Sequence, residues 1–199
     1  TVALTAELRI DSPASERRQQ RVVALFQSDK PRRCPELVTN TLSRVLASGV
    51  EVVTVGGVKN PRLGPGHEHL GVVDVQTLAT LYRTSAVGLC ISASNPSRVP
   101  FEMMAGGLPV VEAHLPNTVF DLPEGACLLA RPEPESLALA IQRAAGEPQR
   151  GELGVSFMRD RDASREQAAF QRFVESAIGG GQISTLPPER LYRASPATT

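Results

Sequence analysis

The sequence has no excess of either charge, because 21 lysines and arginines balance 21 aspartates and glutamates. A chain without net charge has no general electrostatic attraction to nucleic acid. The basic clusters within residues 16–18 and 30–33 are too short to change this balance. We therefore expect no nucleic-acid partner.

Cysteine is also scarce, since the chain has only Cys34, Cys90 and Cys127. An odd number without CxxC spacing argues against a disulfide framework and against a zinc site. Cys90 and Cys127 lie in apolar runs, which is typical of small buried hydrophobic residues. This cysteine usage favours a reducing, cytosolic compartment.

Several segments and motifs that would point to other protein classes are missing. No run approaches the roughly 18 apolar residues of a membrane span, and the first residues lack the charged-then-apolar order of a signal peptide. No GxGxxG follows the first expected strand, and neither GxxxxGK[ST] nor GxSxG occurs. The sequence thus argues against a dinucleotide-binding fingerprint, a P-loop and an α/β-hydrolase nucleophile.

The 199 residues suit one domain with tails. Residues 1–20 are polar in their second half and are expected to form a linker or N-terminal extension. Residues 21–178 are expected to form the domain, and residues 179–199 a flexible C-terminal tail rich in glycine and proline.

Short apolar runs alternate with helical patterns along the predicted domain. Strands are expected at residues 22–26, 50–55, 87–91, 109–111 and 126–129, and helices around residues 37–46, 78–82, 137–144 and 168–178. Nearly continuous apolar runs are typical of strands buried on both faces. The alternation predicts an α/β fold, a Rossmann-like open parallel sheet of about five or six strands with helices on both faces.

Ligands of such sheets bind beyond the carboxyl ends of the strands, so the loops there are candidate sites. The loop after the first expected strand carries Lys30, Arg32 and Arg33 next to a helix start. Cations at a helix N-terminus can hold a diphosphate, although basic surface turns are also common. From the residues alone, both interpretations stay open.

The loop after the second expected strand, residues 56–71, is long and glycine-rich, and we expect a flexible surface loop. Its run His67-Glu68-His69 lacks the HExxH spacing of a helical metal site. The one Asp-x-Asp run in the sequence, Asp160-Arg161-Asp162, is interpreted as surface charges, so we expect no bound metal.

The third candidate loop, residues 92–107, contains turn residues, then Pro100 near a helix start and a glycine pair that ends the helix. Glu102 lies in the first turn of this short helix. Its carboxylate could accept two hydrogen bonds from ribose hydroxyls, or it could simply favour the positive end of the helix dipole.

These residues resemble a known family. Residues 78–92, LATLYRTSAVGLCIS, resemble the "LY..AD.....S" segment of GT-B retaining glycosyltransferases of the group 1, or family 4-like, type. Residues 101–111, FEMMAGGLPVV, resemble their "LEAMA.G.PVV" segment. Residues 94–105 are most similar to bacterial rhamnosyltransferase-type members that build surface polysaccharides. The order of elements matches the family's C-terminal, nucleotide-sugar-binding domain.

The resemblance implies roles for residues of the third loop. The second acid of the family's E-x7-E pattern binds the donor ribose and corresponds to Glu102. The first acid, which handles the transferred sugar, is replaced here by Ser94. The residues between them face the diphosphate through their backbone N–H groups; they include Asn95, Ser97, Arg98 and Val99.

The resemblance also favours the diphosphate clamp for Lys30, Arg32 and Arg33, and it implies that the loop at Leu70 meets the nucleobase. The implied reaction moves a hexosyl group from a dTDP-, UDP- or GDP-linked sugar to a saccharide or lipid-linked acceptor, without a metal or other cofactor. Fixed cations that face the leaving diphosphate would lower its barrier. An N-terminal GT-B domain, in cis or in trans, is expected to hold the acceptor.

On this interpretation the chain is an excised domain or one subunit of a split enzyme, and it transfers little sugar alone. The missing half would bring peripheral association with the inner face of the membrane. The alternative is a non-catalytic GT-B-like interaction or regulatory module, which Ser94 favours. An epimerase-like or response-regulator-like domain would need a glycine fingerprint or clustered acids after the first strand, and neither is present.

Overall fold

The computed structural model describes residues 19–94, 97–159, 161 and 163–178. Its strands are β1 (Gln19–Leu25), β2 (Glu51–Val55), β3 (His67–Gly71), β4 (Ser85–Leu89), β5 (Val110–Ala113) and β6 (Cys127–Ala130). They form a six-stranded sheet in the order β3-β2-β1-β4-β5-β6, and all neighbouring strands are parallel. The predicted open parallel sheet is confirmed.

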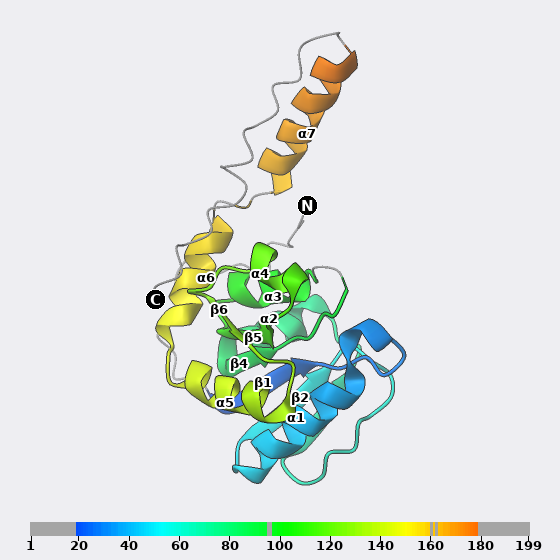
Figure 1. Cartoon of the computed structure of the whole chain (residues 1–199), viewed down its shortest axis with the longest axis vertical. Coiled ribbons are helices and arrows are strands. Elements are labelled where there is room, and N and C mark those ends of the chain that lie inside the picture. Colours follow the sequence, from blue (N-terminus) through cyan, green and yellow to red (C-terminus); the bar gives the residue numbers. More distant parts are fainter. Residues whose placement is uncertain (1–18, 95–96, 160, 162, 179–199) are drawn as a thin grey trace.

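Both faces of the sheet are covered because its strands are apolar on both sides. Along β1, Val22 and Ala24 point to one hydrophobic cluster, and Val23 and Leu25 point to the other. The first cluster is closed by α1 (Pro35–Ala47) and α5 (Pro134–Ala145), which lie side by side below the sheet in Figure 1. The second is closed by α2 (Val75–Thr84), α3 (Val99–Ala105) and α6 (Gln149–Arg159).

One expectation about the sheet is wrong. Residues 67–71 were expected within a flexible surface loop, and they form the edge strand β3. The hydroxyl of Thr54 on β2 lies 2.8 Å from His67 Nε2 and 2.8 Å from His69 Nδ1. These two histidines occupy alternate positions of β3, so they reach the same buried hydroxyl from one face of the strand.

Three elements were not expected from the sequence: the 3₁₀ turn η2 (Pro31–Arg33), α4 (Pro116–Asp121) and α6. The expected closing helix corresponds to α7 (Ala163–Ile178), which extends away from the sheet in Figure 1. Strand β1 starts at Gln19, two residues before the expected domain boundary, whereas residues 1–18 and 179–199 lie outside the described residues. Among the described helices, none is long and apolar enough to cross a membrane.

The strand order places a topological switch point between β1 and β4. From β1 the chain proceeds outward to β2 and β3, and it then returns to β4 on the other side of β1. In open parallel sheets, ligands bind in the crevice outside the carboxyl ends of the strands at such a point. The loops that follow β1 and β4 therefore form the candidate site.

Candidate functional site

The two loops at the switch point are joined to each other. The backbone N–H of Ala93, after β4, donates a hydrogen bond of 2.9 Å to the carbonyl of Arg32, after β1. The structure thus brings together two of the candidate loops, which are about 60 residues apart in sequence.

The predicted cations lie on the β1 side of this junction. Pro31 begins η2, and Cys34 ends it in the left-handed conformation, with φ 47°, directly before α1. Arg32 is exposed and Lys30 is half-buried. Arg33 differs from both, because its Nε and Nη1 atoms are buried and have no hydrogen-bond partner among the described residues.

Glu102 lies on the β4 side of the junction, in the first turn of α3, with Pro100 at the helix start. Its side chain is 17% exposed, and its Oε1 lies 3.9 Å from Nε of the more exposed Arg98. Burial raises the pKa of this carboxyl, and the charge of Arg98 opposes that shift. Both interpretations of Glu102 fit this position: it is a first-turn acid, and it retains carboxylate lone pairs that a ligand hydroxyl could use.

The other predicted residues of the third loop differ in their surroundings. Ser94 is exposed, and Asn95 lies outside the described residues. Ser97 is 6% exposed, and its Oγ accepts a hydrogen bond of 3.3 Å from the N–H of Val99. The Val99 N–H, which was expected to face a diphosphate, therefore already has a partner within the protein.

Leu70 lies at the carboxyl end of β3, on the same edge of the sheet. It is half-buried and packs against the hydrophobic cluster that Val99 also contacts. The carbonyl of Gly71 accepts a hydrogen bond of 2.7 Å from the N–H of Gly56, after β2. The expected base-side segment is therefore a fixed strand end.

A residue that the sequence did not single out lies beneath the third loop. Glu112, on β5, is 0% exposed. Its Oε1 accepts hydrogen bonds from the N–H groups of Ser92, at 3.0 Å, and Ala113, at 2.9 Å. Burial raises the pKa of this carboxyl to about 8, although these two hydrogen bonds and the charge of Arg33 lower it. In the sequence, the only feature that could have drawn attention to Glu112 is its position as a single acid inside an apolar run.

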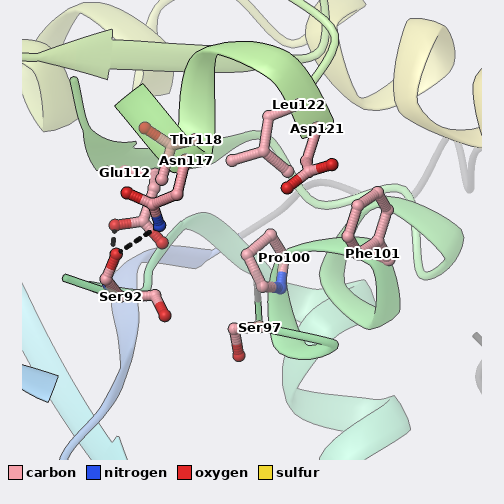
Figure 2. A pocket seen from close by; sticks show the side chains of 9 residues that line it. All are labelled: Ser92, Ser97, Pro100, Phe101, Glu112, Asn117, Thr118, Asp121 and Leu122. Carbon is pink, nitrogen blue, oxygen red and sulfur yellow. Dashed lines mark hydrogen bonds between the residues drawn. The ribbon is translucent and has the colours of Figure 1, made fainter. Parts of the chain in front are cut away.

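A small cavity of about 10 Å³ lies between β5, α3 and α4. Figure 2 shows the side chains of Ser92, Ser97, Glu112, Asn117 and Thr118 around it. Asn117 Nδ2 donates a hydrogen bond of 2.9 Å to the carbonyl of Ser92. The start of the third loop is therefore held from β5 and from α4.

Among the described residues, no group of three or more histidine, cysteine or acidic side chains is arranged to hold a metal ion. His67 and His69 instead share the hydroxyl of Thr54, as described above. Burial lowers the pKa of His67, and His69 lowers it further. The two histidines thus belong to the packing of β3 on β2.

Comparison with known proteins gives a family match over most of the domain. Residues 20–142 match the family described as WsaF, C-terminal domain. The O-antigen biosynthesis protein RfbC of Myxococcus xanthus is 30% identical over 146 residues, which cover 70% of this chain and 12% of that protein.

Two solved structures are similar in fold. Sucrose-phosphate synthase of Thermosynechococcus elongatus has a TM-score of 0.59 at 23% identity, over 79% of this chain and 46% of that one. HepE of Anabaena, solved in complex with UDP, has a TM-score of 0.65 at 19% identity, over 78% of this chain and 48% of that one. At these identities the likeness shows the fold alone, which is that of GT-B glycosyltransferases. The chain spans about half of either structure.

Proposed function

The chain belongs to the WsaF C-terminal domain family, and on this basis we propose that it binds the nucleotide-sugar donor of a GT-B glycosyltransferase in surface polysaccharide synthesis. The O-antigen biosynthesis relative supports the pathway, and the UDP complex of HepE supports the ligand class. The proposed reaction is the transfer of a hexosyl group from a nucleoside diphosphate to a saccharide or lipid-linked acceptor.

The observation that carries this proposal is the junction of two loops at the switch point. Through the bond from Ala93 to the carbonyl of Arg32, the basic turn after β1 lies against the loop that leads to Glu102. Cations on one side and a half-buried carboxylate on the other match the two ends of a nucleoside diphosphate. In the proposed complex the diphosphate lies toward Arg33, and the ribose hydroxyls lie toward Glu102.

The chemistry that this arrangement can supply is electrostatic. When the glycosidic bond to the diphosphate breaks, negative charge accumulates on the leaving phosphate oxygens. Cations on η2, such as Arg33, would stabilise that charge, because η2 holds their backbone at the strand end. Glu102 would act before this step, by fixing the ribose and thereby the diphosphate.

The acceptor side of the reaction requires a further domain. Since the chain spans about half of the GT-B structures compared, we propose that an N-terminal GT-B domain, in cis or in trans, binds the acceptor and closes over the donor. The chain alone is then expected to bind nucleotide weakly and to transfer little sugar.

A non-catalytic module is the second candidate, and Ser94 is the observation that favours it. Ser94 is exposed on the loop where the resembling family has an acid that handles the transferred sugar. Sugar transfer by the chain combined with its N-terminal domain would exclude this candidate. Nucleotide binding without transfer by that same combination would favour it.

Calorimetric titration of the 199-residue chain with UDP, GDP and dTDP tests the proposal. We expect one of these nucleotides to bind and Glu102→Ala to weaken that binding at least about tenfold, since each hydrogen bond to a charged group contributes roughly 1.5–3 kcal/mol. Glu51→Ala is the matched control, because Glu51 is exposed at the amino end of β2, on the opposite edge of the sheet. No binding of any of the three, or equal binding by both variants, would reject the site.

A further inference from the structure

Glu112 connects β5 to the loop that bounds the proposed donor site. It is 0% exposed, and its Oε1 accepts the N–H of Ser92 at 3.0 Å. Ser92 precedes Ala93, whose N–H is bonded to the carbonyl of Arg32. The carboxyl therefore fixes the start of the β4–α3 loop at the point where that loop meets the basic turn.

The second oxygen of Glu112 is buried and has no hydrogen-bond partner among the described residues. Beside the carboxyl lies the cavity of about 10 Å³ that Ser97 and Asn117 also line, as Figure 2 shows. A space of this size holds about one water molecule. An unpartnered carboxyl oxygen in such a place is rare, because burying a polar atom without a hydrogen bond is unfavourable.

Arg33 has unpartnered atoms in the same region. Its Nε and Nη1 are buried without a hydrogen bond, and its charge acts on the carboxyl of Glu112. Within the described residues, however, no ion pair of 4.0 Å or less joins these two side chains. A buried guanidinium that is near a carboxyl and yet not paired with it retains donors for an anion.

We infer that Glu112 is a positioning residue for donor binding: its carboxyl fixes the loop at Ser92 while it leaves the guanidinium of Arg33 unpaired for the diphosphate. This inference rests on the proposed function. It adds a residue from β5 to a site otherwise built from the loops after β1 and β4, and it makes nucleotide affinity depend on the charge of that residue.

The direction of this dependence follows from the groups around Glu112. Burial raises its pKa to about 8, while Arg33 and the Cys90 thiol lower it. Among the described residues, the other titratable groups near it are Cys34 before α1, Cys127 on β6 and Asp121 of α4. Below about pH 8 the carboxyl is neutral, so Arg33 can face the diphosphate. Above that pH the carboxylate attracts Arg33 and repels the phosphates, so affinity falls.

Calorimetric titration with UDP, GDP and dTDP at about pH 7.5 and pH 9 tests the inference on the 199-residue chain. The terminal phosphate of each nucleotide is already ionised at both values, because its second pKa is about 6. For the wild type we expect affinity to fall by up to about eightfold, since a group with a pKa of 8 goes from about one quarter to nine tenths ionised. In Glu112→Gln, which keeps an oxygen for Ser92, we expect a change of less than about twofold.

A second variant keeps the test decisive if Glu112→Gln folds poorly. Arg33→Gln should bind more weakly than the wild type at pH 7.5 and should show a smaller fall toward pH 9, because only the repulsion between the Glu112 carboxylate and the phosphates remains. An equal fall in the wild type and in either variant would overturn the inference and leave the proposed function standing. No binding of any nucleotide by the wild type at pH 7.5 would instead reject the proposed function, and the inference with it.

Discussion

Replacing Glu112 by glutamine should change how the stability of the fold depends on pH. The pKa of this carboxyl is about 8 in the folded chain, above the ordinary value of 4.5, chiefly because of burial. Between these two values the folded state retains a proton that the unfolded state has lost, so the free energy of unfolding falls as pH rises. The slope for one such group is about 1.4 kcal/mol per pH unit.

Urea denaturation of the wild type and of Glu112→Gln, between about pH 5.5 and pH 7.5, measures this effect. The stability of the variant relative to the wild type should rise by about 2.5 kcal/mol over that range, because the glutamine does not titrate. If burying the glutamine amide destabilises the variant, it does so equally at every pH, so the stability difference between variant and wild type keeps the same dependence on pH. A relative stability that stays constant across the range would refute the assignment of a buried, protonated Glu112.

Glu147→Gln is the matched control for this measurement. Hydrogen bonds and ion pairs with Arg143 and Arg150 lower the pKa of Glu147, so its contribution is present above the ordinary pKa and is lost as pH falls through the folded value. The pH range in which Glu147 changes stability therefore lies below its ordinary pKa of 4.5. The stability of Glu147→Gln relative to the wild type should stay constant between about pH 5.5 and pH 7.5.

Two further predictions concern packing, and both are checked by urea denaturation at one pH. A Cβ on Gly151 of α6 would lie 2.1 Å from the Gly107 carbonyl oxygen, so Gly151→Ala should destabilise the chain by about 3 kcal/mol. Gly146→Ala is the control, because its Cβ would lie 3.5 Å from the Arg143 carbonyl oxygen, and it should change stability by less than about 0.5 kcal/mol. Equal losses of stability in the two alanine variants would contradict the packing of α6. Thr54→Val should cost about 1–3 kcal/mol, because it leaves the ring nitrogens of His67 and His69 without their shared hydroxyl. A loss below about 0.5 kcal/mol would show that β3 does not depend on that contact.

The sequence predicted those strands that are identified by the apolar pattern of their own residues. The run at residues 22–26 is apolar on both faces, and a segment of that kind is stable only between two covering layers. The same holds for β2 and β4, and together they were enough to predict the α/β class.

Strand β3 could not be predicted, because the contacts that stabilise it are made with residues of β2. His67-Glu68-His69 is polar, and it pairs with β2 at the edge of the sheet through contacts with Thr54. No feature within residues 67–71 identifies that partner, whereas the glycines before them suggested a loop.

The candidate site was predictable only in part. The family-like motif located Glu102, and the composition of the turn located Arg33 as one of three cations. The sequence could not distinguish Arg33 from Arg32, because the difference between them arises when η2 forms. In the folded chain Arg33 has buried guanidinium atoms, whereas Arg32 is exposed. Glu112 was missed because one acid among apolar residues reveals its importance only when Ser92 and Arg33 are folded around it.

The most direct test is a crystal structure of the 199-residue chain with the nucleotide diphosphate that binds it best. The account predicts that the diphosphate lies between the loops after β1 and β4, with its oxygens within hydrogen-bond distance of Arg33. It also predicts that the ribose hydroxyls lie within hydrogen-bond distance of the Glu102 carboxylate. A nucleotide bound elsewhere, or bound at the switch point with Glu102 turned away from the ribose, would contradict it.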